Sequence, residues 1–338
     1  IKKAHEAGLM NVDLPAEYGG GGVDHLTSAI ITEELAAGCA GIATILGANS
    51  LAATPIVLAG TEEQKRKYLG HLCSGPRLAA FGLTEPGAGS DAGAIATTAR
   101  REGDPYVLNG TKCFITNGGV AELYTIFAST DRSRGHRGLS AFIVPGDTPG
   151  LKGGKKEKKM GIRASHTAEV VLEDVRVPAE NLLGREGEGF KIAMRTLDIT
   201  RPGVAANALG VARAALEVAT RYSRERQQFG KPISANQAIQ FMLADMAMML
   251  ESARLLVWKA AWMLDQGMDA SMESAMSKCL AGDMAMKVTT DAVQILGGYG
   301  YMRDYPVEKL MRDAKIMQIY EGTNQIQRLV IARALIKG

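Results

Sequence analysis

The chain has 338 residues, of which 46% are hydrophobic and 22% charged, so two or three folded substructures with large cores are expected. Such a composition excludes a disordered or fibrous protein. Lys and Arg exceed Asp and Glu by 39 to 36, and a net charge of +3 does not predict a nucleic-acid-binding surface. The 39 glycines are many beside 11 prolines, and clustered glycines allow backbone to approach a ligand, which favours small-molecule chemistry.

Cysteine spacing and charge-free stretches exclude several other classes of protein. The cysteines lie far apart in the sequence, at Cys39, Cys73, Cys113 and Cys279. They form no C-x-x-C pair, so neither a metal site nor a disulfide framework is expected, and a reducing compartment fits. Residues 35–61 carry no charge, but their glycines and polar residues favour a core helix broken near Asn49 to Pro55 over a membrane span. Because the first residue is Ile1, an N-terminal segment is expected to be missing and no targeting signal can be judged.

The first two zones of the chain differ in their hydrophobic period. Residues 1–76 have a helical pattern that predicts an N-terminal helical domain, in which Thr61 and Gln64 have the spacing of a capping box. Residues 77–184 predict a middle antiparallel β domain, because short β-branched runs alternate with glycine and polar turns. No helical stretch separates these runs, which argues against a Rossmann domain. Strands are expected at residues 97–101, 106–116, 123–130, 139–145 and 168–177.

Residues 185–338 return to the helical period and predict a C-terminal helical domain of the four-helix-bundle type. Ser234 and Gln237 have the spacing of a second capping box, ahead of a long helix. Its apolar stripe comprises Ile239, Met242, Met246, Met249, Ala253 and Leu256. Asp269 or Ser271 is expected to cap the next helix, which runs toward Gly297, and a last helix begins near residue 323. Broad apolar faces on these helices predict self-association.

A glycine-rich segment at residues 81–91 is the first candidate site. It contains three close glycines beside hydroxyl side chains, which is typical of a loop that offers backbone N–H groups to a phosphate or flavin oxygen. A wide β-turn would have the same composition. Residues 111–119 end an expected strand with Phe114, a hydroxyl and a turn, which suits a wall for a planar ring and equally an ordinary strand-to-hairpin boundary.

Four more segments make the combination specific: residues 197–201, 224–230, 294–300 and 319–328. With the two segments above, they closely resemble the acyl-CoA dehydrogenase family of flavoproteins, in order and over essentially the whole chain. The resemblance implies an α+β fold with an N-terminal helical domain, a middle antiparallel β domain and a C-terminal four-helix-type bundle. This three-part architecture matches the zones described above.

By this resemblance the protein is an enzyme that binds FAD and oxidises a short- to medium-chain acyl-CoA to its trans-2-enoyl-CoA. Glu321 stands at the family's catalytic-base position and would remove the α-proton while the β-hydride passes to flavin N5. A carboxylate beside Gly322, just ahead of the last expected helix, can be presented to a buried α-carbon without a bulky neighbour. The alternative is a helix N-cap carboxylate without chemistry.

The resemblance also implies the remaining contacts and no metal. Expected FAD contacts are Phe81, Leu83, Thr84, Ser90, Phe114, Ile115, Thr116, Arg226, Phe229, Gln237, Gln294, Ile295, Gly297, Gly298, Thr323 and Gln325. Those at 226, 229, 237 and 294–298 match positions that reach FAD across a subunit boundary. Expected substrate contacts are Ser90, Ser165, Asp198, Arg201, Tyr320 and Gly322. Phe114 replaces a tryptophan of many members, and for Gly298 and Gly300 a tight-turn role is the alternative.

Residues 38–47 resemble the acyl-pocket wall of the straight-chain enzymes. Their small side chains, such as Ala43 and Gly47, leave room and place a medium chain slightly ahead of a short one. Thr200 is no carboxylate, although the isovaleryl and long-chain branches carry their base at this place. The lysines between residues 152 and 159 would steer anionic CoA or form a solvated loop.

Other members of the family remain alternatives, namely an enoyl-CoA reductase and a branched or cyclic acyl-CoA dehydrogenase. A non-catalytic, DNA-associated scaffold of the same fold is disfavoured by the low net charge and by the presence of Glu321. The resemblance implies an electron-transferring flavoprotein as acceptor, a tetramer built as a dimer of dimers, and a role in fatty acid β-oxidation. Bacterial cytoplasm and mitochondrial matrix both fit, with neither nucleic acid nor a membrane span expected.

Overall fold

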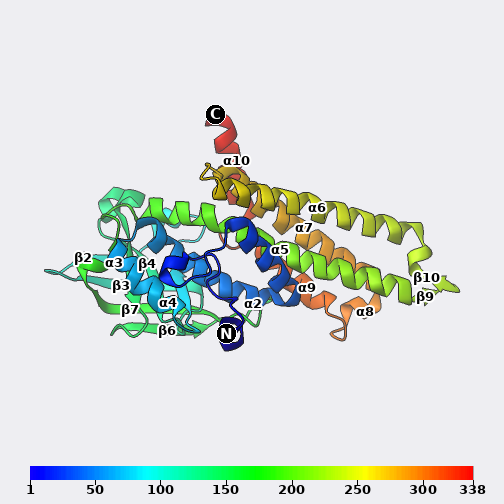
Figure 1. Cartoon of the computed structure of the whole chain (residues 1–338), viewed down its shortest axis with the longest axis horizontal. Helices are drawn as coiled ribbons and strands as arrows, with labels where there is room; N and C mark the ends of the chain where they lie inside the picture. Colours follow the sequence, from blue (N-terminus) through cyan, green and yellow to red (C-terminus); the bar gives the residue numbers. More distant parts are fainter. Residues whose placement is uncertain (338) are drawn as a thin grey trace. The chain divides into compact units, whose positions relative to one another are not determined.

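The computed structural model describes residues 1–337 (Figure 1). These residues divide into two compact units. Unit 1 comprises residues 1–24, 45–158 and 165–200, and unit 2 comprises residues 25–44, 159–164 and 201 onward. Two long helices, α2 (His25–Ala59) and α5 (Gly189–Glu225), therefore each contribute to both units. The domain boundaries expected at residues 76 and 184 stay a prediction.

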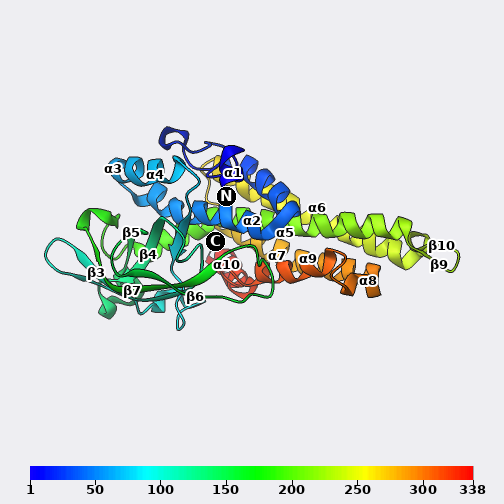
Figure 2. The same cartoon turned by 90° about the horizontal axis from the view of Figure 1, so that it is seen from below.

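Unit 1 contains a β-sheet (Figure 2). Among the described residues this sheet has eight strands, in the order β6-β7-β3-β2-β4-β5-β8, with β1 paired to β4. The strands are β1 Ala79–Gly82, β2 Thr98–Arg101, β3 Tyr106–Thr116, β4 Leu123–Ser129, β5 Leu139–Pro145, β6 Leu151–Lys156, β7 Thr167–Val177 and β8 Leu182–Leu183. The sheet is mainly antiparallel, but β1 and β2 pair parallel with β4. The expected antiparallel β domain therefore has two parallel pairs in addition, and β2 and β3 provide the crossover that the parallel β1–β4 pair requires.

All five strands predicted from the sequence occur within one residue of their expected ends. Strand β1 was missed because it has four residues and runs directly into the glycine-rich segment. Strand β6 was missed because lysine and glycine conceal its period, and it lies at the sheet edge with almost every residue exposed. Charged residues on an edge strand prevent pairing with another sheet. Lys152 and Lys155 form ion pairs with Glu173 and Glu157, which favours the solvated alternative for this lysine cluster.

The core of unit 1 occupies both faces of the sheet. Strand β4 is buried along its whole length, and its alternate residues enter different apolar clusters. Phe127 packs in a cluster with Ala52 of α2 and Ile192 of α5, whereas Ile126 packs with Val170 of β7. The short helices α1 (Lys2–Glu6), α3 (Glu62–Gln64) and α4 (Gly70–Cys73) complete the unit.

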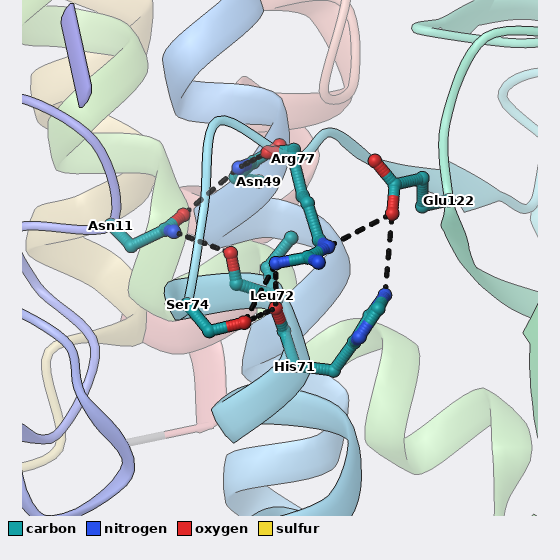
Figure 3. Close-up of polar contacts among 7 residues, drawn as sticks. All are labelled: Asn11, Asn49, His71, Leu72, Ser74, Arg77 and Glu122. Carbon is teal, nitrogen blue, oxygen red and sulfur yellow. Dashed lines mark hydrogen bonds and ion pairs between the residues drawn. The ribbon is translucent and has the colours of Figure 1, made fainter. Parts of the chain in front are cut away.

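A buried amide, Asn49 of α2, fixes the chain where it enters β1 (Figure 3). Its Nδ2 donates to Asn11 Oδ1 and to Arg77 O, both at 2.9 Å, and its Oδ1 accepts from Ala79 N at 2.7 Å. The Arg77 side chain also donates from Nε to Glu122 Oε2 at 3.0 Å. The N-terminal end of β1 is thus anchored, and the glycine-rich segment follows from the other end of this strand.

Unit 2 is built from long helices around an alanine-rich core (Figures 1 and 2). Helices α6 and α7 run side by side in both views, and the core cluster joins them to α5. The elements are α6 Gln237–Asp265, α7 Ser271–Leu296, α8 Gly298–Tyr301, α9 Val307–Ala314 and α10 Asn324–Lys337, with a hairpin of β9 Gln227–Gln228 and β10 Lys231–Pro232 between α5 and α6. This helical architecture agrees with the expected bundle.

The predicted helix caps have different outcomes. The box at Thr61 and Gln64 is confirmed, since Thr61 N donates to Gln64 Oε1 at 2.8 Å and Gln64 N to Thr61 Oγ1 at 3.2 Å. The second box is wrong: within the described chain α6 begins after Asn236 without a side-chain cap bond. Its predicted cap, Ser234, is part of a 3-10 turn and cannot adopt the extended N-cap conformation. The cap expected at Asp269 or Ser271 is also not formed, because in the part of the chain that the structure describes α7 begins after Ala270 without a side-chain cap bond; Asp269 Oδ1 accepts from Ser271 N at 3.1 Å from outside the N-cap position.

The break predicted in α2 near Asn49 to Pro55 is also wrong. The helix continues through Pro55 to Ala59, and its non-helical residue is Cys39, with φ −163° and ψ 107°. Pro55 removes one backbone hydrogen bond inside α2, yet the helix continues through it. By length and hydropathy α2 is a candidate membrane span, but half of its most apolar stretch is buried within the protein, as in core helices.

Candidate active site

A β-bulge in unit 1 turns Phe114 out of the sheet. The pairing of β3 with β7 shifts between Lys112 and Ile115, and Phe114 has φ 59°. A bulge changes the direction of one side chain relative to its neighbours. Lys112, Cys113 and Ile115 are therefore buried, whereas Phe114 is 66% exposed. The sequence predicted an aromatic wall here, and the bulge presents the ring outside the protein's own core.

The structure brings the two expected flavin segments of unit 1 together. Cys113 N donates to Thr84 O at 2.9 Å, and Lys112 Nζ donates to Leu83 O at 3.2 Å. The backbone that continues β1 is therefore bonded directly to the bulge of β3. Phe81 and Thr84 are half-buried beside the buried Leu83, and Thr116 is half-buried at the end of β3.

Lys112 belongs to a buried ion pair that sequence analysis did not identify. Its Nζ lies 2.7 Å from Glu85 Oε1, and the two side chains are 0% and 5% exposed. Burial lowers the pKa of Lys112 to about 8, although Glu85 opposes this shift. Burial alone would raise the pKa of Glu85, but Lys112 and the donors of Thr97 and Ala96 hold it below its usual value. Both groups are thus charged at neutral pH.

The glycine-rich segment forms a tight turn and then an exposed stretch. Glu85 and Ala88 exchange backbone hydrogen bonds at 3.1 and 3.0 Å, so Pro86 and Gly87 form the tip of the turn. A Cβ atom at Gly87 or Gly89 would meet nothing within 4 Å, and neither residue has a positive φ. The chain's own packing does not require glycine at either place, which favours a ligand that approaches this backbone. Ser90, which follows, is exposed.

In unit 1, Ser165 is buried just ahead of β7 and Asp198 is half-buried on α5. Arg201 lies three positions further along the same helix, in unit 2, and is 3% exposed. The helix thereby carries two of the expected substrate residues.

Unit 2 presents Glu321 on a strained turn between a 3-10 turn and α10. Glu321 has φ 51° and Gly322 has φ 88°. The positive φ of Gly322 favours glycine, and a Cβ atom there would lie 2.7 Å from Gln327 Nε2 and displace that amide. Thr323 is the N-cap of α10, since its Oγ1 accepts from Ile326 N at 3.2 Å. The N-cap role considered for Glu321 is therefore taken by Thr323.

The turn is held by side chains that the sequence did not single out. Gln327 Nε2 donates to Glu321 O at 3.1 Å and to Gly322 O at 2.9 Å. Lys278 Nζ, from the middle of α7, donates to the same Gly322 O at 2.7 Å. A lysine inside an otherwise apolar helical stretch would have been the only sequence signal for this contact.

Tyr320 precedes the turn and donates its hydroxyl to Met317 Sδ at 3.0 Å. Burial and the neighbouring Glu321 carboxylate raise the pKa of Tyr320, so its hydroxyl remains protonated. Tyr320 can therefore donate a hydrogen bond but does not supply a base. Gln325, on the first turn of α10, is exposed.

A cavity of about 480 Å³ lies between the ends of α5 and α7 in unit 2. It is lined by Tyr222, Arg226, Gln228, Ile233, Ile295, Leu296, Gly297, Gly298, Tyr299 and Met302. The Arg226 guanidinium lies 5.5 Å from the Tyr299 ring centroid, so a cation and an aromatic face meet in the cavity. Four of the expected cross-subunit residues line it; the other three, Phe229, Gln237 and Gln294, are exposed outside it.

The structure separates the two glycines whose roles were open. A Cβ atom at Gly300 would lie 2.4 Å from Val293 O, so packing explains that glycine. A Cβ atom at Gly298 would meet nothing within 4 Å, and its φ is ordinary. Gly297 differs again, because its φ of 59° and ψ of −135° suit glycine. Gly298 therefore leaves open backbone at the cavity wall.

Three family models match the chain in order. They are the N-terminal, middle and C-terminal domains of acyl-CoA dehydrogenase, over residues 1–76, 80–175 and 187–336. The mitochondrial short-chain specific acyl-CoA dehydrogenase of Rattus norvegicus is 52% identical over 338 residues, which cover 100% of this chain and 82% of that protein. The chain belongs to the acyl-CoA dehydrogenase family.

Solved structures agree with this family. Butyryl-CoA dehydrogenase from Megasphaera elsdenii has a TM-score of 0.97 and 53% identity, over 99% of this chain and 89% of that one. A chain from a structure of the electron transferring flavoprotein of Acidaminococcus fermentans has a TM-score of 0.98 and 56% identity, over 100% of this chain and 89% of that one. The protein is thus an FAD-dependent acyl-CoA dehydrogenase, a flavoprotein oxidoreductase of fatty acid oxidation.

The residues present suit the cofactor of an acyl-CoA dehydrogenase. FAD combines an anionic pyrophosphate with planar rings, and Arg226 with the open backbone at Gly298 can accommodate either part. The exposed ring of Phe114 and the open backbone at Gly87 provide comparable features in unit 1. Within residues 1–337, no group of three His, Cys, Asp or Glu side chains is arranged for a metal ion.

Proposed function

We propose that this acyl-CoA dehydrogenase acts on short straight-chain acyl-CoA thioesters and that Glu321 is its catalytic base. The observation that carries the base assignment is the turn at Glu321 and Gly322, which is strained, firmly hydrogen-bonded and not needed to cap α10. Strained backbone persists only where its surroundings hold it, and it is concentrated at functional sites. The names of the relatives favour the short end of the expected range, since several are short-chain specific enzymes and one is a butyryl-CoA dehydrogenase.

In the proposed reaction, the Glu321 carboxylate takes the α-proton of the thioester, and the Cα–H electron pair forms the new double bond to Cβ. FAD supplies the acceptor for the hydride that leaves Cβ. The product is the trans-2-enoyl-CoA, and Glu321 finishes the step protonated. Tyr320, whose raised pKa keeps its hydroxyl protonated, takes no proton itself.

The remaining site residues are proposed in the roles stated for them above. In unit 1, Phe81, Leu83, Thr84, Ser90, Phe114, Ile115 and Thr116 would contact FAD, and Ser90, Ser165 and Asp198 the substrate. In unit 2, Arg226, Phe229, Gln237, Gln294, Ile295, Gly297, Gly298, Thr323 and Gln325 would contact FAD, and Arg201, Tyr320 and Gly322 the substrate. The cavity at Arg226 and the open backbone at Gly298 support this assignment.

Substitution of Glu321 by Gln tests the base. General-base catalysis contributes about 10²- to 10⁴-fold, so kcat of E321Q with butyryl-CoA is expected to fall by that factor while the protein remains yellow. Glu217→Gln, on the exposed surface of α5, is the control and should keep wild-type turnover. Turnover of E321Q within a few-fold of wild type would show that another group removes the proton.

The substrate class is tested by anaerobic addition of saturated acyl-CoAs to the purified holoenzyme. Butyryl-CoA is expected to bleach the visible flavin absorbance. Octanoyl-CoA is expected to bleach it to a smaller extent or more slowly. Bleaching by octanoyl-CoA alone would return the preference to medium chains. Absence of bleaching by every straight-chain acyl-CoA of short or medium length would refute the proposed substrate.

An apolar stripe on α6 supports the proposed tetramer. Its members are spaced seven residues apart and are 60%, 60%, 63% and 49% exposed: Phe241, Met248, Leu255 and Trp262. A repeat of seven is the spacing by which helices pack along a shared seam.

An electron-transferring flavoprotein is proposed as acceptor on the basis of the Acidaminococcus fermentans neighbour. Both bacterial and mitochondrial enzymes occur among the relatives, and either compartment is proposed.

The three-domain division at residues 76 and 184 is proposed as the functional division of the chain. It is supported by the ranges of the three family models, which leave residues 77–79 and 176–186 between them.

A further inference from the structure

We propose that Lys278 is a positioning residue of the dehydrogenation reaction, whose ammonium group on α7 holds the turn that carries Glu321. This inference rests on the proposed role of Glu321 as the base. It adds a residue that does not touch the reacting atoms but acts through the base.

The turn needs hydrogen-bond donors from outside itself. Glu321 and Gly322 both have positive φ, so their carbonyl groups do not point along a regular helix. Gln327 Nε2 serves both carbonyls, at 3.1 and 2.9 Å. Lys278 Nζ approaches Gly322 O more closely, at 2.7 Å, and is the charged donor of the two. Charge-assisted hydrogen bonds are about twice as strong as neutral ones.

Lys278 is in an unusual position for a lysine. It lies in the middle of α7, its side chain is 1% exposed, and it is among the largest fully buried side chains of unit 2. Lysine is almost never buried unless it is paired or has a specific task. Its second bond, to Asn324 Oδ1 at 3.1 Å, reaches the first residue of α10. The ammonium group thereby joins the turn to the helix behind it.

The partners of Lys278 extend this attachment along one face of α7. Asn324 Nδ2 donates to Cys279 O at 2.9 Å and to Asp283 Oδ1 at 2.8 Å. Asp283 also accepts from Gln318 Nε2 at 2.7 Å, on the other side of the turn. The residues on both sides of the turn are therefore bound to α7. Lys278 is the α7 side chain that contacts the turn itself, at Gly322 O.

The charge of Lys278 adds an electrostatic effect to the hydrogen bonds. Burial lowers the pKa of Lys278 to about 8; Arg201 acts in the same direction, whereas Glu321, Cys279 and Asp283 oppose it. At neutral pH the ammonium form prevails and favours the ionised form of the nearby Glu321. As pH rises through 8, the charge is lost although N–H donors remain.

The test compares Lys278→Met and Lys278→Gln holoenzymes by pH-dependent kinetics with butyryl-CoA. K278M loses both the hydrogen bond and the charge. Its kcat is therefore expected to fall by about 10- to 100-fold, as for slight misplacement of a catalytic group, while KM changes by less than about threefold. K278Q keeps an N–H donor but no charge, so its kcat should fall less. In both variants the alkaline limb of kcat/KM near pH 8 should disappear.

Lys287→Met is the matched control, because Lys287 is on the same helix but 60% exposed and paired with Asp291. It should keep the wild-type pH profile. If K278M does not fold, the K278Q profile decides. A wild-type kcat together with an unchanged alkaline limb in either folded variant overturns the inference. E321Q separates the two proposals: high turnover of E321Q refutes the base itself, whereas an inactive E321Q with a wild-type K278M profile refutes only Lys278.

Discussion

The buried pair Glu85–Lys112 should couple strongly, and its strength can be worked out from the structure. Lys112→Met leaves the 5%-exposed Glu85 carboxylate with the donors of Ala96 and Thr97 only, and removal of one partner from a buried pair costs about 3–5 kcal/mol. Glu85→Gln leaves a buried ammonium beside Leu83 O. Because Glu85 raises the pKa of Lys112, its loss lowers that pKa further, and the lysine can then remain buried as the neutral amine, at about 1.4 kcal/mol for each unit of pKa. E85Q is therefore expected to be milder than K112M.

The assay is a double-mutant cycle of E85Q and K112M, with urea unfolding of the holoenzyme. The coupling energy is expected at about 2–3 kcal/mol. Lys152 and Glu173 provide a matched control on the same sheet: their atoms lie 2.9 Å apart, but their side chains are 65% and 63% exposed. Exposed pairs typically contribute about 0.2–1 kcal/mol. Equal coupling in the two cycles would refute the argument that burial determines the strength of the pair.

The remaining predictions concern cofactor and assembly. Gly298→Ala should weaken FAD binding, measured by fluorescence titration of the apoenzyme, without lowering its melting temperature, because the new Cβ meets nothing in the chain. Gly300→Ala should instead lower the melting temperature, since its Cβ would lie 2.4 Å from Val293 O; the opposite pattern would contradict both roles. Leu255→Glu in the α6 stripe should reduce the tetramer to smaller species in light scattering, whereas the exposed Gln240→Glu should not; an intact L255E tetramer excludes this seam.

Much of the fold was predictable because its signals are local. The strand Tyr106–Thr116 has its own β-branched pattern, and Thr61 caps a helix only three residues ahead of its partner. Ser234 has the same local spacing, but Pro232 places it in a 3-10 turn, and the capping box does not form. Pro55 is the converse case, because the helix continues through it to Ala59 although proline lacks the N–H for one backbone hydrogen bond. Local rules failed where the neighbouring backbone had already determined the conformation.

The supports of the site were not predictable, because they depend on burial. Lys112 and Lys278 have no sequence pattern of their own, and lysine is normally expected at the surface. Their roles emerge only when the bulge of β3 and the packing of α7 bring each ammonium group to a backbone carbonyl, at Leu83 and Gly322. The resemblance to a family identified residues proposed to touch ligands. It did not identify the residues that hold them.

Backbone strain connects three proposed site residues that lie far apart in the sequence. Phe114, Phe229 and Glu321 have φ values of 59°, 53° and 51°, a region that costs a residue with a Cβ roughly 1–2 kcal/mol. Ile162 has φ 42°, but its side chain is 5% exposed and its packing offsets the strain. Phe114 and Phe229 are 66% and 97% exposed, so their own side chains provide no such compensation. At Phe229 the positive φ belongs to the two-residue loop Phe229–Gly230 of the β9–β10 hairpin, where a type I′ turn needs φ above zero at both positions. At Phe114 it belongs to the bulge of β3, which leaves the ring outside the core of unit 1.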